Sequence, residues 1–195
     1  MSISENGTYS GAAPEEEVYY RLDIQQAEVV TMTFESYQNY SASITLYDNE
    51  YDKIDDWNAY YDGNRNAAYE KVNLYLCPGN HYIKLRVDKT ATYSFQLNSK
   101  KVTETFPESQ TDRNDILSQA KSVSLGQKIY GMIGNEDKQD FYVFDMPFSG
   151  NLVVSHTNYI ESGQADYEIL NSEGNSISSF RVHIRLDIVL EHQRQ

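Results

Sequence analysis

Short apolar stretches that alternate with polar residues recur along almost the whole chain, and this pattern constrains its fold most. The stretches are rich in Val, Ile, Tyr, Phe and Thr, and turn-forming residues separate them at intervals of about 8–12 residues. In Tyr82–Val87, for example, Ile83 and Leu85 alternate with Lys84 and Arg86, as in a strand with one buried face. The pattern predicts an all-β protein built from antiparallel sandwiches.

The pattern also assigns the individual elements. The predicted strands are Val18–Ile24, Glu28–Ser36, Ser41–Asp48, Ala67–Leu76, Asn80–Asp88, Ala91–Ser99, Gln127–Ile133, Asp140–Met146, Asn151–Asn158, Ala165–Asn171 and Phe180–Leu190. One short helix is predicted over Asn114–Val123, with Asn114 as its cap. The acidic stretch Asp48–Asp62 is interpreted as a solvated loop between two strands.

The two halves of the sequence match one another at a nearly constant spacing. Val18–Ile24 matches Asp140–Met146 at an offset of 122 residues, and Ser41–Glu50 matches Gln164–Glu173 at an offset of 123. Two unrelated strand-rich segments can match once by chance, but successive segments do not then keep the same offset. We therefore predict two tandem copies of one antiparallel, jelly-roll-like β-sandwich.

The two predicted copies, residues 1–100 and 103–195, differ in what they contain. After Ile54 the first copy has room for three more strands, whereas after the matching Ile177 the second has room for one. The second copy is therefore predicted to be truncated by two strands, and it begins with an acidic head that the first lacks. Because open strand edges tend to pair with other chains, we expect some self-association through exposed strand edges.

Several motifs resemble one bacterial family. In the second copy these motifs are Glu108–Ala120, Leu125–Gly126, Tyr130–Gly131, Asp137–Phe144 and Gly150–Val154; in the first they are Leu76–Val87 and Ala91–Leu97. Together they resemble the bacterial pre-peptidase C-terminal domain, a β-sandwich appended to secreted peptidases and surface proteins and related to the collagen-binding domains of clostridial collagenases. The resemblance implies a non-catalytic role and an extracellular or cell-surface location.

The acidic head of the second copy contains five candidate calcium ligands. They are Asp112, Asn114, Asp115, Asp137 and Asp140. Calcium takes about six to eight oxygen ligands, which carboxylates and carboxamides from two loops can supply. In the collagen-binding relatives this motif binds calcium, and the resemblance implies the same role here. The alternative is that these residues only form turns and helix caps, which Asp and Asn favour.

Tyrosine is unusually frequent, with 17 residues in the chain, of which 13 fall within residues 1–100. Flat aromatic side chains with a polar edge suit stacking on sugars or packing on fibrous proteins. The candidate ligand-binding residues are Trp57, Tyr60, Tyr61, Tyr82 and Tyr93. The alternative is that they are ordinary strand residues, because tyrosine is favoured in sheets.

Charge and missing motifs exclude several classes of protein. The 29 acidic and 16 basic residues give a net charge of -13, which argues against nucleic-acid binding. No apolar run approaches the length of about 18 residues that a membrane helix needs, so no membrane insertion is expected. The patterns typical of zinc proteases, serine hydrolases and phosphate loops are absent, which predicts that the chain is not an enzyme. The single cysteine, Cys77, is expected to be a buried free thiol.

Two classes of function remain. The first is an extracellular module that binds a polysaccharide or a fibrous protein on an aromatic surface, with calcium as a stabilising ion. The second is a structural, assembly or chaperone-like role within a larger secreted or surface protein, such as a peptidase. Binding that depends on exposed aromatic rings separates the first class from the second.

Overall fold

The computed structural model describes residues 1–12, 17–37, 41–87, 91–103, 114–155, 164–183 and 191–193. In these residues the regular structure is β-strand apart from one 3-10 turn at Leu117–Gln119, so the predicted all-β class is confirmed. Within the same ranges no helix is long and apolar enough to cross a membrane.

The chain divides into two units that alternate along the sequence. The first unit comprises Met1–Arg113 and Tyr130–Asp140, and the second comprises Asn114–Ile129 and Phe141–Gln195. The first unit therefore includes Tyr130–Asp140, a segment that the sequence pattern assigned to the second copy. We call this segment the returning segment.

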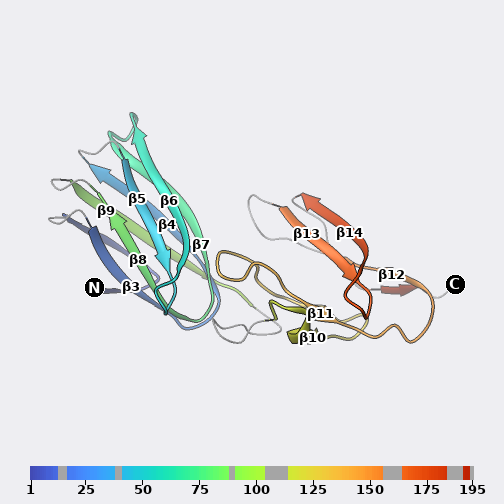
Figure 1. Ribbon diagram of the computed structural model, residues 1–195. Coiled ribbons are helices and arrows are strands. Elements are labelled where there is room, and N and C mark those ends of the chain that lie inside the picture. Colours follow the sequence, from blue (N-terminus) through green and yellow to red (C-terminus); the bar gives the residue numbers. More distant parts are fainter. Residues whose placement is uncertain are drawn as a thin grey trace. The chain divides into compact units, whose positions relative to one another are not determined.

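The first unit contains one sheet of nine strands (Figure 1). Its strands are β1 (Ser2–Ile3), β2 (Gly7–Ala12), β3 (Glu17–Ile24), β4 (Glu28–Tyr37), β5 (Ser41–Tyr47), β6 (Lys53–Asp62), β7 (Ala67–Leu76), β8 (Gly79–Arg86) and β9 (Thr92–Lys101). Their order across the sheet is β1-β3-β8-β5-β6-β7-β4-β9-β2. All neighbours are antiparallel except β1 with β3.

This sheet folds over so that its two halves face each other. Tyr20 in β3 and Tyr93 in β9 lie far apart in the strand order, yet their hydroxyls share a buried hydrogen bond of 2.6 Å. The ring of Tyr20 also meets Phe95 of β9 edge-on, with 4.9 Å between the ring centroids. Met32 and Phe34 of β4 are fully buried because alternate residues of a strand point to the same face. The first unit is therefore a β-sandwich with a continuous apolar core.

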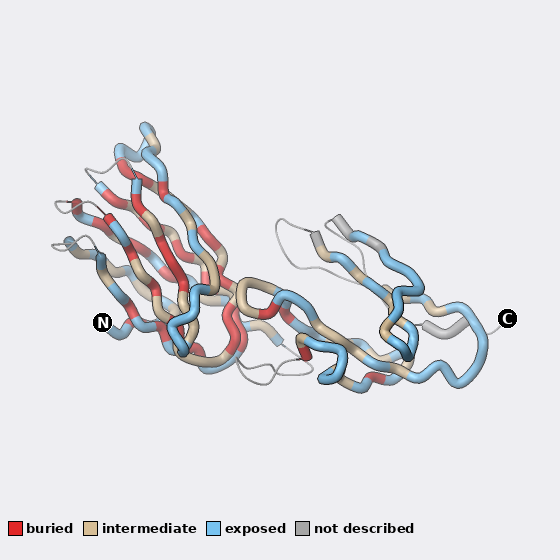
Figure 2. The backbone as a smooth tube through the Cα atoms, in the orientation of Figure 1, coloured by how far each residue is buried: buried red, intermediate tan, exposed pale blue. Residues whose placement is uncertain are grey.

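The second unit has three short two-stranded ladders in its described residues. They pair β10 (Lys121–Ser122) with β11 (Tyr142–Val143), β12 (Asn151–Val153) with β15 (Glu191–Gln193), and β13 (Gln164–Leu170) with β14 (Ser176–His183). Buried residues are concentrated in the first unit (Figure 2). Where the burial of the second unit is described, only Asn114 and Val123 are buried. This part of the chain therefore has little apolar core of its own.

The β13–β14 hairpin repeats the register of the β5–β6 hairpin. Adding 123 to both residue numbers converts all seven β5–β6 pairs into the seven β13–β14 pairs. Ile44 opposite Trp57 becomes Tyr167 opposite Phe180, for example. The irregularity after Leu46 in β5 recurs at the equivalent place in β13. The offset found in the sequence is thus also the offset of the two hairpin backbones.

The turns of the two hairpins are equivalent as well. In the first, Oδ1 of Asp48 accepts hydrogen bonds from the backbone N–H groups of Glu50 and Asp52, at 2.9 and 2.8 Å. In the second, Oδ1 of Asn171 accepts hydrogen bonds from the backbone N–H groups two and four residues further along the chain, at 3.0 and 2.9 Å. Tyr51 and Gly174 occupy the same position, with φ of 67° and 80°. Such a φ favours glycine, so Tyr51 holds a strained conformation that Gly174 adopts easily.

The prediction of a solvated loop over Asp48–Asp62 is wrong for most of its length. Lys53–Asp62 forms β6, which pairs with β5 and β7. β6 contains three acidic residues, so its composition resembles that of a loop. Its burial nevertheless alternates, because Ala59 is buried while Asn58 and Tyr60 are exposed. A strand with one solvated face tolerates such polar residues on that face.

Two further predictions in the second half of the chain are also wrong. The predicted helix over Asn114–Val123 is reduced to a 3-10 turn, and its apolar residues Ile116 and Leu117 are about half exposed, at 52% and 50%. Without a face to pack against, a short amphipathic helix has little to stabilise it. The predicted strand Gln127–Ile133 is a loop. Parts of two other predicted strands, at 156–158 and 184–190, lie outside the described residues.

Candidate functional site

The outer face of β3, β8 and β5 carries neighbouring tyrosine and basic side chains. The pairing register places Tyr82 of β8 between Arg21 of β3 and Tyr47 of β5. Two residues further along β8, Lys84 lies opposite Tyr19 of β3. We call this surface the outer tyrosine face, and it comprises Tyr19, Arg21, Tyr47, Tyr51, Tyr82, Lys84 and Arg86.

Two rings of this face form a contact pair. Tyr51, in the turn between β5 and β6, lies against Tyr82 with 4.7 Å between ring centroids and 33° between ring planes. The Tyr51 and Tyr82 hydroxyl oxygens lie 3.5 Å apart, and this contact is the largest cause of the raised pKa of Tyr82. Tyr51 is 67% exposed. A bound molecule can therefore reach an aromatic surface with two hydroxyl groups at its edge.

The basic side chains are held beside these rings by polar partners. Nε and Nη2 of Arg21 donate to Oδ1 of Asn80 at 3.1 and 2.7 Å. Nζ of Lys84 donates to Glu17 at 3.4 Å. The pKa of Glu17 is lowered first by its hydrogen bond from Tyr19 and then by the charge of Lys84. Sequence reasoning missed Arg21 and Lys84 as site residues, because only the β3–β8 register shows that they flank tyrosines.

The structure does not bring the five predicted aromatic residues onto one surface. Tyr60 and Tyr61 are 66% and 47% exposed, but adjacent strand residues point to opposite faces of the sheet. Trp57 is half-buried and packs against the core. Tyr93 is buried in that core, so the prediction that its ring contacts a ligand is wrong. Tyr82 is the predicted residue that lies on the outer tyrosine face.

The returning segment docks against the turn between β7 and β8. Oδ1 of Asn135 accepts a hydrogen bond from the backbone N–H of Tyr75, and Nδ2 of Asn135 donates to Asp55, both at 2.8 Å. Met132 is buried in a small apolar cluster with Ala27 and Cys77. The expected buried free thiol at Cys77 is confirmed. These contacts hold the returning segment against β6 and β7.

A buried polar contact anchors the same segment. Oε1 of Glu136 lies 2.8 Å from Nε2 of His81, and both side chains are almost fully buried, at 1% and 0% exposure. Oε2 of Glu136 accepts a hydrogen bond of 2.8 Å from the backbone N–H of Cys77. Because both carboxylate oxygens have partners, the arrangement satisfies a group that would be costly to bury alone. We assign this contact a structural role.

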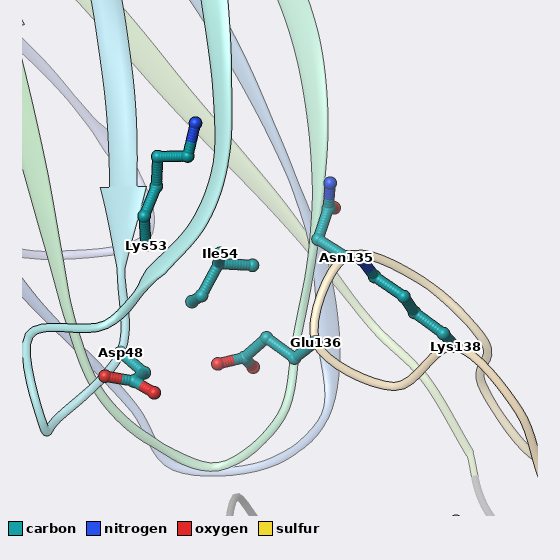
Figure 3. A pocket seen from close by; sticks show the side chains of 6 residues that line it. All are labelled: Asp48, Lys53, Ile54, Asn135, Glu136 and Lys138. Carbon is teal, nitrogen blue, oxygen red and sulfur yellow. The ribbon is translucent and has the colours of Figure 1, made fainter.

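A polar hollow of about 220 Å³ lies beside the anchored segment (Figure 3). It is lined by Asp48, Lys53, Ile54, Asn135, Glu136 and Lys138. Its carboxylates are already engaged, because Asp48 accepts the turn hydrogen bonds and Glu136 contacts His81. Its polar groups therefore mainly hold the fold together.

The predicted calcium ligands are divided between the two units. Asp112 lies outside the described residues, Asn114 and Asp115 belong to the second unit, and Asp137 and Asp140 belong to the first. Asn114 is fully buried; its Nδ2 donates to the carbonyl of Phe141 at 3.0 Å, while its Oδ1 has no hydrogen-bond partner among the described residues. Asp137 is 1% exposed. Buried side-chain oxygens suit a cation, although no group of three or more His, Cys, Asp or Glu side chains arranged for a metal occurs in the described part.

Comparison with known proteins gives a likeness to solved structures. No protein-family model matches the sequence, and no curated protein matches it. A solved structure that resembles the chain is the pre-peptidase C-terminal domain of a collagenase from Bacillus anthracis, with 16% sequence identity and a TM-score of 0.38. The match covers 50% of this chain and 92% of that domain. A likeness of this degree carries no information about ligands.

Proposed function

We propose that the chain is a non-catalytic extracellular module that binds an extended polymer, either a polysaccharide or a fibrous protein, through tyrosines of the first unit. The observation that carries this proposal is the exposure of aromatic rings on a rigid sandwich, with Tyr51 and Tyr82 in contact on the outer tyrosine face. Rigid aromatic rings lose little conformational entropy on binding. The family-like motifs in both halves of the sequence support an accessory role.

An array of polysaccharides and collagens tests this proposal. We expect at least one polymer to bind, and Tyr82→Ala to weaken that binding at least tenfold. Tyr37→Ala is the matched control, because Tyr37 is also exposed but lies at the end of β4, away from the outer tyrosine face. Absence of binding across the array, or equal loss in both variants, would refute the proposal.

An assembly role is the second candidate, and the second unit favours it. Its side chains Phe148 and Ile177 are each 66% exposed, and Val143 is 50% exposed. Large apolar side chains exposed on a surface are candidates for contact with another protein. Self-association at rising concentration, measured by sedimentation and reduced by Phe148→Ser, supports this role; a monomer throughout contradicts it.

A further inference from the structure

Tyr51 and Tyr82 are two tyrosines in ring contact at the protein surface. Their ring centroids are 4.7 Å apart, and their hydroxyl oxygens lie 3.5 Å apart. Tyr51 is 67% exposed, so an oxidant in solution can reach its phenol group. Tyr20 and Tyr93 also share a hydroxyl contact, but both are buried in the core. The Tyr51–Tyr82 pair therefore offers two phenol rings together where a reagent can reach them.

The backbone brings Tyr51 to this pair at a cost. Tyr51 has a φ of 67°, which favours glycine, and the equivalent turn of the second unit has Gly174 at this position. Oδ1 of Asp48 fixes the turn by accepting hydrogen bonds from the backbone N–H groups of the two residues that flank Tyr51. Strained residues are concentrated at functional sites. Glycine would relieve the strain here but would remove the ring, which indicates a use for the ring.

Both rings are held in place before any reaction. Tyr82 lies in β8, where it is paired with Arg21 of β3 and with Tyr47 of β5. Oxidative coupling of two tyrosines joins the ring carbons next to the hydroxyl-bearing carbons. Because the two hydroxyls lie 3.5 Å apart, these carbons are at the same end of the pair. Groups held in this way couple more readily than free groups, because the entropy of bringing them together is already lost.

From these contacts we infer that Tyr51 and Tyr82 are a site of oxidative cross-linking, which joins the two rings as dityrosine. The oxidant is hydrogen peroxide used by a haem peroxidase. Each phenol loses one electron and its hydroxyl proton, and the two phenoxyl radicals then form a carbon–carbon bond. The hydrogens on the two bonded carbons move to the phenolic oxygens, which restores both aromatic rings. The peroxide takes up the two electrons and two protons and becomes two water molecules.

The position of the cysteine is compatible with this chemistry. A thiol reduces a phenoxyl radical back to the phenol, so an accessible thiol competes with coupling. Cys77 is the single cysteine of the sequence, and it is fully buried. The two radicals can therefore couple before the protein's own thiol reduces them.

The cross-link fastens the turn between β5 and β6 to β8. It closes the stretch of chain between residues 51 and 82, and a covalent bond across such a loop restricts the unfolded chain, as a disulfide does. We therefore expect the cross-linked protein to unfold at a higher temperature. The reaction needs no polymer, so this inference goes beyond the proposed function and does not depend on it.

Treatment of the full chain with a haem peroxidase and hydrogen peroxide tests the inference. We expect dityrosine fluorescence in the monomer, a mass lower by two hydrogen atoms, and a proteolytic fragment that joins the peptides containing Tyr51 and Tyr82. The cross-linked fraction of monomer should not change when the protein is diluted, because coupling within one chain does not depend on concentration. The Tm of the cross-linked monomer should exceed that of the untreated chain.

Three variants locate the site. Tyr51→Phe and Tyr82→Phe should each lower the dityrosine fluorescence of the monomer at least fivefold. Phenylalanine keeps the ring but has no hydroxyl to oxidise, so this loss is not due to unfolding. Tyr60→Phe is the matched control, because Tyr60 is 66% exposed and also lies opposite another tyrosine, Tyr69. It should leave the fluorescence of the monomer unchanged.

The contrary outcomes are equally definite. Absence of dityrosine from the monomer, or a link that maps to other tyrosines, overturns the inference. A link found only between chains, with a yield that falls on dilution, overturns it too. Equal Tm values with and without the link would show that the link does not fasten the turn. Each of these results leaves the binding of a polymer to its own test.

Discussion

Gly134→Ala tests whether the returning segment is docked as described. A Cβ atom at residue 134 would lie 2.1 Å from Cβ of Tyr75, whereas ordinary contact begins at 3.4 Å. The Tyr75 Cβ belongs to β7, whose backbone is held in place by its pairing with β4. The segment must therefore move by the difference, about 1.3 Å.

A movement of this size breaks the hydrogen bonds that hold the segment. Asn135 and Glu136 accept bonds of 2.8 Å from the backbone N–H groups of Tyr75 and Cys77. A neutral hydrogen bond contributes about 0.5–1.5 kcal/mol to stability, and one to a charged group contributes about 1.5–3 kcal/mol. We expect the free energy of docking to fall by about 2–4 kcal/mol. Because about 1.4 kcal/mol corresponds to a factor of ten, hydrogen exchange should speed up by roughly 30- to 1000-fold.

Amide exchange measured by NMR provides the assay. The amides of Tyr75 and Cys77 should lose protection in the variant, while those in the middle of β4 and β9 keep theirs. Gly63→Ala is the control, because the nearest atom to its added Cβ lies at 3.9 Å. If Gly134→Ala leaves both amides as protected as in the parent protein, the docking described for this segment is wrong.

Two further predictions concern buried oxygens. Glu28 is 2% exposed and accepts a hydrogen bond from Ser99, and burial raises its pKa. A raised carboxyl pKa stabilises the fold below the unfolded-state pKa of 4.5, and this contribution is lost as pH rises through the folded-state pKa. Urea unfolding should therefore show Glu28→Gln to be more stable than the parent at pH 7 and equal to it at pH 4; equal stability at pH 7 would contradict this. Calcium at about 100 times its dissociation constant should stabilise the protein by about 2.7 kcal/mol, seen as a higher Tm that chelator reverses. Asn114→Ala should abolish that shift, whereas Asn64→Ala should not. If calcium leaves the Tm of the parent protein unchanged, the predicted calcium site is wrong.

Strands with a clear alternation were predictable from sequence. The prediction Val18–Ile24 corresponds to β3, and Glu28–Ser36 corresponds to β4, each within one residue of the observed bounds. Their buried positions hold large apolar residues, so the two-residue period stands out. β2, with the sequence Gly-Thr-Tyr-Ser-Gly-Ala, was not predicted, because its pairing with β9 supplies the order that its own composition does not.

The outer tyrosine face was less accessible to sequence reasoning. Tyr82 could be singled out as an aromatic residue on a half-buried strand, but its neighbours Arg21 and Tyr51 are 61 and 31 residues away in the sequence. Their proximity depends on the β3–β8 register and on the shape of one turn. Tyr93 shows the opposite error, because the alternation of β9 places tyrosine as well as phenylalanine in the core.

The alternation of the two units along the chain sets an order on their completion during synthesis. A ribosome delivers every strand of the nine-stranded sheet before it delivers Asn135 and Glu136, and residues 114–129 of the second unit emerge in between. Until then, the backbone N–H groups of Tyr75 and Cys77 lack the side-chain acceptors that later cover them. The first unit is therefore completed by the returning segment only after synthesis of the second unit has begun.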